Sequence, residues 1–334
     1  MKVIHTFISH DDTKITEVSL LTQVLSALSW KHHNPSDTLW LYTNTKTLSE
    51  YKSYGIDKLY DKIDTDVLDR YPSNINNKVF WATPKLWVMK NQTTPFVNLD
   101  TDFVFHKKLQ MIDDSVVFLH QENPTTYPFP TKLEHSDDFK WSEIELSGFL
   151  NSLPVNTALS IWTDISFLQK YLDRYFEFVT NNEGRMTLTE DEVRYTHKNG
   201  AQLTSEQWLL SAMILLEQQT NENFSSKSLL PILSHIAGFK PQDYNMPLPQ
   251  LMEGVNNSMF HLWNSKSVFE MGNYSVFTAL VKSLTSSISN LIPSLNDDTL
   301  YDILESITDS VRKVPDDSII ESNEETQTQT TKSD

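Results

Sequence analysis

The chain has 334 residues, of which 39% are hydrophobic and 11% aromatic, enough apolar material for one large domain or two small ones. Its formal net charge of −17 argues against nucleic-acid binding and against adhesion to an anionic membrane, because both need a basic face. Cysteine is absent, which excludes disulfides and thiolate metal sites. With no visible secretory leader and no apolar run of membrane-spanning length, we expect a cytoplasmic protein without an integral membrane segment.

The N-terminal part of the chain alternates strand patterns with helix patterns. We expect strands at Lys2–Ile8, Leu39–Thr43, Lys58–Ile63 and Phe96–Leu99. Helices are expected from Thr16 or Asp12 to about Trp30, from Leu48 to Tyr54 with Gly55 as the stop, and over residues 78–91. This alternation predicts an α/β fold with a mostly parallel central sheet and helices on both faces.

The rest of the chain is less regular. We expect a strand at Ser115–His120, an irregular region over 123–154, an apolar run from Ala158 followed by a helix over Phe167–Phe178, a loop over 181–203 and a helix over Ser205–Gln218. Residues 274–312 read as amphipathic helices broken at Pro293, which would pack on the preceding domain or bind a partner. We predict a domain over 1–272, a helical C-terminal extension over 273–314 and a disordered polar tail over 315–334.

The most informative segment is an apolar strand that leads directly into Asp100 and Asp102. Open α/β sheets bind their ligands at the carboxyl ends of their strands, and hard carboxylate oxygens there suit Mg²⁺ or Mn²⁺ shared with substrate phosphates. The same tripeptide occurs at Asp64-Thr65-Asp66, but a short helical pattern follows it, which Asp64 or Thr65 would cap. The chain has only 7 glycines and none are clustered, so a bound diphosphate would be held by a metal and side chains rather than by a glycine-rich loop.

Several short segments occur in an order typical of one enzyme family. They are Ile4–Ser9, Leu41–Asn44, a helix with Lys85, Asp100-Thr-Asp102, Asn156-Thr157, Glu206-Gln207 and His261-Leu-Trp263. This order resembles the GT-A-fold glycosyltransferases that use nucleotide sugars, especially the retaining type with an Asp-x-Asp motif and a late histidine. The resemblance covers roughly residues 1–270.

The resemblance implies roles for individual residues. Asp102 would coordinate the divalent cation, Asp100 would bind the cation or the ribose of the donor, and His261 would complete the metal site. Lys85 and Asn156 would contact the sugar nucleotide, as would Thr6 and Tyr42 in the first two segments, while Glu206 and Gln207 would face the acceptor or the sugar. Lys266 would reach the diphosphate, although Asn264 replaces the usual glycine and Lys266 falls one residue early. Simpler interpretations stay open, with His261 a core histidine, Lys85 a surface lysine and Glu206 a first-turn helix residue.

The implied activity is transfer of a sugar from a nucleotide diphosphate-sugar, a UDP-sugar foremost, to a glycan or protein acceptor, by a hexosyltransferase-like enzyme that uses Mn²⁺ or Mg²⁺. The cation would neutralise the charge that develops on the leaving diphosphate. Inversion would need a carboxylate base, for which Glu122, Glu206 and Asp164 are available, and the resemblance favours retention. The alternatives are a metal-dependent phosphotransferase or hydrolase and a non-catalytic binding protein. The acidic charge disfavours DNA glucosylation.

Overall fold

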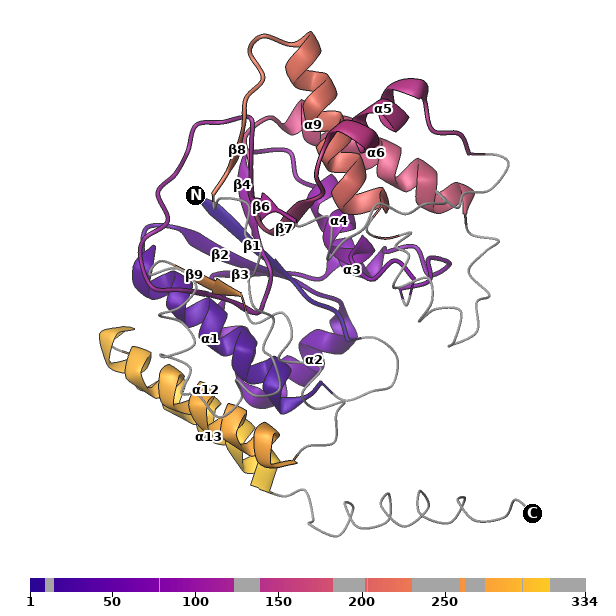
Figure 1. Ribbon diagram of the computed structural model, residues 1–334. Helices are drawn as coiled ribbons and strands as arrows, with labels where there is room; N and C mark the ends of the chain where they lie inside the picture. The colour runs from indigo at the N-terminus through magenta and orange to yellow at the C-terminus, as the bar shows by residue number, and fades with distance from the viewer. Residues whose placement is uncertain are drawn as a thin grey trace, which may run out of the picture.

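A computed structural model describes residues 1–9, 15–77, 79–122, 139–182, 202, 204–229, 259–261, 274–295 and 297–312. In these residues a seven-stranded sheet lies between two layers of helices (Figure 1). The prediction of an α/β fold with a mostly parallel sheet and helices on both faces is therefore confirmed.

The sheet has the strand order β3-β2-β1-β4-β7-β6-β8. The strands are β1 Lys2–Thr6, β2 Thr38–Tyr42, β3 Lys62–Asp64, β4 Phe96–Leu99, β6 Val116–Gln121, β7 Val155–Trp162 and β8 Ser226–Ser228. All neighbouring pairs are parallel except those of β7, which runs antiparallel to β4 and β6. A separate two-stranded antiparallel sheet pairs β5, Phe103–Phe105, with β9, Met259–His261.

Each face of the sheet has its own apolar layer. One face is covered by α1 Glu17–His33, α2 Thr45–Tyr54, α12 Tyr274–Leu295 and α13 Thr299–Arg312. The other is covered by α3 Asp66–Asp69, α4 Thr83–Lys90, α5 Glu143–Asn151, α6 Ile165–Asn181 and α9 Leu209–Thr220. Alternate residues of the strands divide between the two layers, as with Phe96 and Val97 of β4, which explains the continuous apolar runs of the central strands.

Local signals set the ends of several helices as predicted. Thr16 caps α1 by accepting a hydrogen bond from the Ser19 N–H. Gly55 ends α2 with φ 74°, a left-handed conformation that glycine adopts without a steric penalty. Asp64 Oδ1 accepts the Val67 N–H at 3.2 Å at the start of α3, so this first Asp-Thr-Asp sequence belongs to a helix start.

Other element predictions need correction. The predicted strand at Lys58–Ile63 is a 3₁₀ helix, η1 Ile56–Leu59, followed by the short β3. The helix over 78–91 begins only at Thr83, because Pro84 favours the first turn of a helix. The region expected to be irregular contains α5, and the helix expected from Ser205 opens with one π-helical turn, η3 Thr204–Trp208.

The predictions for the C-terminal part are only partly testable. Residues 274–312 do form helices, but Pro293 does not break α12, which continues to Leu295. The polar tail, Lys266, residues 123–138 and most of the predicted loop over 181–203 lie outside the described residues, and the boundary after residue 272 stays a prediction. Among the described helices none has the length and apolar character that a membrane crossing requires.

Candidate functional site

The Asp-x-Asp sequence lies at the carboxyl edge of the central sheet. The Asp100 N–H donates to the Ala158 carbonyl of β7 at 2.7 Å, and the Phe103 N–H donates back to the Asp100 carbonyl at 3.2 Å. The chain therefore turns tightly between the end of β4 and the start of β5. Because β7 is antiparallel to β4, its first residues lie at this same edge.

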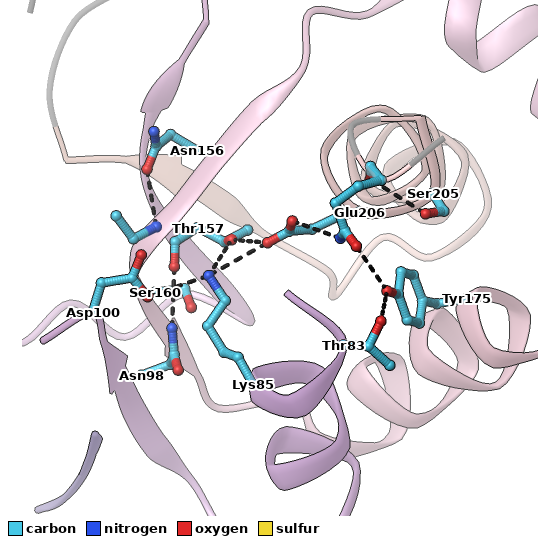
Figure 2. Close-up of polar contacts among 12 residues, drawn as sticks. Thr83, Lys85, Asn98, Asp100, Asn156, Thr157, Ser160, Tyr175, Ser205 and Glu206 are labelled. Atoms are coloured by element: carbon cyan, nitrogen blue, oxygen red, sulfur yellow. Dashed lines mark hydrogen bonds and ion pairs between the residues drawn. The ribbon is translucent and has the colours of Figure 1, made fainter. Parts of the chain in front are cut away.

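The Lys85 side chain gathers three segments at this edge (Figure 2). Its ammonium donates to Asp100 Oδ1 at 3.2 Å and to Thr157 Oγ1 at 3.3 Å, and lies 3.4 Å from Glu206 Oε1. We call Lys85, Asp100, Thr157 and Glu206 the lysine cluster. Its members come from α4, the end of β4, the start of β7 and η3, so the tertiary fold alone brings them together.

Buried hydrogen bonds hold the Glu206 side chain in place. Thr157 Oγ1 donates to Glu206 Oε1 at 2.7 Å, and Gln202 Nε2 donates to Glu206 Oε2 at 2.9 Å. Tyr175 then donates to Gln202 Oε1 at 3.2 Å and lies 2.7 Å from the Thr83 hydroxyl. Both Glu206 oxygens are thus engaged, and the carboxylate is a fixed anion beside Lys85.

The ionisation of Lys85 follows from these neighbours. Burial acts to lower the pKa of Lys85, but the Asp100 and Glu206 carboxylates outweigh it, so the pKa is raised above its ordinary value. The ammonium therefore stays charged at neutral pH. The predicted helix-surface alternative for Lys85 is wrong, since its side chain is only 16% exposed and faces two carboxylates.

Asp102 follows in the same turn, between the end of β4 and the start of β5. It is only 6% exposed, and its carboxylate is close enough to influence the fully buried His5. The β5–β9 ladder pairs Phe103 with His261, which places the backbone of the predicted third metal ligand beside the residue that follows Asp102.

The donor chemistry of this edge fits a divalent cation. Asp100 and Asp102 supply hard oxygens of the kind that Mg²⁺ and Mn²⁺ prefer, and Lys85 faces two carboxylates, those of Asp100 and Glu206. Within the described residues, no group of three or more histidine, aspartate or glutamate side chains forms a complete ligand set. The metal site expected from Asp100, Asp102 and His261 therefore stays a prediction.

A second polar group surrounds Asn156 at the start of β7. Asn156 Nδ2 donates to Glu122 Oε1 at 2.7 Å, and its Oδ1 accepts the Ala158 N–H at 2.9 Å. His120 Nδ1 lies 3.9 Å from Glu122 Oε2. Asn156 is adjacent in sequence to Thr157 of the lysine cluster, so the two polar groups share one edge of the sheet.

Asp164 lies away from this edge, whereas Thr6 and Tyr42, the last residues of β1 and β2, and Gln207, next to Glu206, lie at or beside it. Asp164 caps α6 by accepting the Phe167 N–H at 2.9 Å, and Trp162 is buried at the far end of β7. The Tyr42 hydroxyl accepts a hydrogen bond from Lys2 Nζ at 2.7 Å. Neither Thr6 Oγ1 nor Gln207 Oε1 has a hydrogen-bond partner among the residues that the structure describes, although both atoms are buried.

Sequence comparison places the chain in a family. The profile of a family of unknown function (DUF6734) matches residues 1–252. The chain belongs to this family. No curated protein matches it.

Among the solved structures that this DUF6734 chain resembles, two are distant likenesses with low identity. An active-site mutant of LgtC aligns at 8% identity and a TM-score of 0.33, over 59% of this chain and 70% of that one. The PaToxG glycosyltransferase aligns at 11% identity and a TM-score of 0.36, over 93% of this chain and 86% of that one. The site residues themselves must therefore carry any proposal about this DUF6734 protein.

Sequence reasoning missed several members of the site. Thr157 is next to a predicted residue, and Gln202 lies one helical turn before Glu206, so both were within reach of a local pattern. His5 and Tyr175 gave no such signal. His5 in β1 and Tyr175 in α6 take their hydrogen-bond partners from other elements of the fold, so a local pattern does not indicate them.

Proposed function

We propose that this protein is a metal-dependent glycosyltransferase that uses a nucleotide diphosphate-sugar, with a UDP-sugar as the first donor to test. One observation carries the proposal, the position of Asp100 and Asp102 at the carboxyl edge of the central sheet beside a buried lysine. This is where open α/β sheets bind ligands, and the residue types suit a cation with a diphosphate.

The acidic residues and Lys85 would have different roles because their charges differ. Asp100 and Asp102 would hold Mn²⁺ or Mg²⁺, with His261 as a further ligand, and the bound ion would neutralise charge on the leaving diphosphate. Lys85 supplies a permanent positive charge within 3.2 Å of Asp100, where it favours an anionic group of the donor.

Glu206 supports Lys85 rather than acting as a proton acceptor, since Thr157, Lys85 and Gln202 occupy its two oxygens. Asn156 and Glu122, which are hydrogen-bonded at the start of β7, extend the polar edge toward β6. A hydrogen-bonded amide and carboxylate of this kind suit sugar hydroxyls, on a donor or on a glycan acceptor.

A thermal-shift experiment tests the proposal directly. The protein is heated with UDP, GDP or CMP, each with and without Mn²⁺, and the melting temperature is compared. We expect an increase only when Mn²⁺ is combined with one of the diphosphates, because ligands that bind the folded state alone stabilise it. No increase with any combination would contradict the proposal.

The Asp102→Asn variant should lose the Mn²⁺-dependent increase and at least about 10²-fold in transfer rate, because a ligand of the cation is removed. Transfer is measured with a panel of UDP-sugars and followed by the appearance of glycosylated acceptor, which separates transfer from hydrolysis. The matched control is Asp66→Asn, in the other Asp-Thr-Asp sequence, which is exposed in α3 and should behave as the wild type. Loss of both the fold and the response in Asp102→Asn would leave the metal assignment unsupported.

A further inference from the structure

Lys85 stands where a divalent cation would be expected to act. Its ammonium lies 3.2 Å from Asp100 Oδ1 and 3.4 Å from Glu206 Oε1, and Asp100 is one of the two carboxylates proposed to hold the metal. A cation that binds Asp100 must therefore displace this ammonium or lie beside it. Two positive charges at such a separation repel strongly in a partly buried site.

We propose that Lys85 is a built-in counter-ion of Asp100, which gives up that carboxylate to the metal only when a diphosphate arrives to replace it. This inference rests on the proposed function and adds an order of binding to it. Metal alone binds weakly, and metal together with a nucleoside diphosphate binds tightly.

The geometry supports an exchange of one partner only. Thr157 contacts both Lys85 and Glu206, at 3.3 and 2.7 Å, so the ammonium keeps two partners when Asp100 leaves. Glu206 stays in place when Asp100 turns to the cation. Gln202 holds its other oxygen at 2.9 Å, and Gln202 is itself hydrogen-bonded to the buried Tyr175. Of the two carboxylates that face Lys85, Asp100 is the more exposed, with 29% of its side chain accessible against 4% for Glu206.

The diphosphate restores the charge balance. When Asp100 turns to the cation, Lys85 loses an anionic partner, and the phosphate oxygens of the donor supply a new one. The cation and the diphosphate therefore assist each other through Lys85 in addition to their direct contact. Such coupling is reciprocal and typically amounts to about 5–150-fold in affinity.

Calorimetric titration of the full chain tests the inference with Mn²⁺ alone and with UDP in the presence of Mn²⁺. In Lys85→Met the affinity for Mn²⁺ alone should rise about tenfold, because the competing ammonium is gone. The affinity for UDP with Mn²⁺ should fall by a similar factor. The control is Lys90→Met, which removes a half-buried lysine of the same helix, paired with Asp173, and should change neither value.

A second variant keeps the inference testable if Lys85→Met does not fold. Asp100→Asn should weaken UDP binding with Mn²⁺ by about tenfold, and by more than it weakens the binding of Mn²⁺ alone. Weaker binding of Mn²⁺ alone in Lys85→Met, or an equal loss for both ligands in Asp100→Asn, would overturn the inference alone. A wild-type protein that binds neither Mn²⁺ nor UDP would overturn the proposed function as well.

Discussion

Lys85 and His5 are both buried beside the Asp-x-Asp turn, yet they settle in opposite states of charge. Lys85 faces two carboxylates and remains an ammonium. His5 is fully buried, and this burial, opposed only in part by Asp102, lowers its pKa from 6.5 to about 3. Its ring nitrogens lie 3.1 Å from the Tyr60 hydroxyl and 3.4 Å from the Ser26 hydroxyl, neutral partners that do not require a charged imidazole.

The neutral state of His5 predicts a dependence of stability on pH. Between pH 6.5 and about 3 the unfolded chain binds a proton at this residue that the folded chain does not, so the free energy of unfolding falls as the pH falls. Below about pH 3 this contribution no longer changes. His5→Asn should reduce the slope between pH 6 and 4 by about 1.4 kcal/mol per pH unit, as measured by urea unfolding. An unchanged slope would show that His5 is protonated in the folded protein.

Helix α5 shows how an element forms without a clear apolar period. Ser142 accepts the Glu145 N–H, and Glu145 in turn accepts the Ser142 N–H at 2.6 Å, so a capping box starts the helix. The helix then packs so closely on α9 that a Cβ atom added at Gly148 would lie 2.6 Å from Ala212 Cβ and 2.9 Å from its Cα. Glycine at this position permits the close crossing of the two helices.

The crossing gives a prediction for α5. Gly148→Val should lower the free energy of unfolding by about 1–3 kcal/mol, because the added methyl groups overpack a contact with backbone. The matched control is Ser147→Val, which places the same β-branched side chain on an exposed position of the same helix. Urea unfolding measures both, and equal losses in the two variants would show that the contact with Ala212 is not tight.

The C-terminal helices α12 and α13 cover the outer side of α1. Residues Leu20 to Trp30 of α1 are buried on every side, because the sheet covers one side and α12 and α13 cover another (Figure 1). Leu284 and Ile288 of α12 and Ile303 of α13 belong to the same apolar cluster as the strands. The two helices therefore pack on the sheet domain, the first of the two arrangements expected from the sequence.

This shared core predicts that the C-terminal helices unfold together with the sheet. Leu284→Ala should destabilise the whole protein by about 2–5 kcal/mol and shift a single unfolding transition. Ser286→Ala, at an exposed position of the same helix, serves as the control and should stay within about 0.5 kcal/mol of the wild type. A variant that loses only α12 and α13, with the main transition in place, would instead make them an independent appendage.

The sequence by itself determined features that depend on neighbours along the chain. The α/β alternation, the caps at Thr16 and Asp64, the stop at Gly55 and the position of Asp100 after a buried strand are all local patterns. Short-range hydrogen bonding and side-chain periodicity fix them, so a single sequence is enough.

Only the tertiary structure decided how charges far apart in sequence are combined. The reversed direction of β7 brings Thr157 to the edge where Asp100 lies, and the η3 turn brings Glu206 to Lys85. Burial keeps His5 neutral, whereas the carboxylates of Asp100 and Glu206 keep Lys85 charged despite its burial. No pattern along the chain encodes those distances, and the lysine cluster became visible only when the strands and helices were in place.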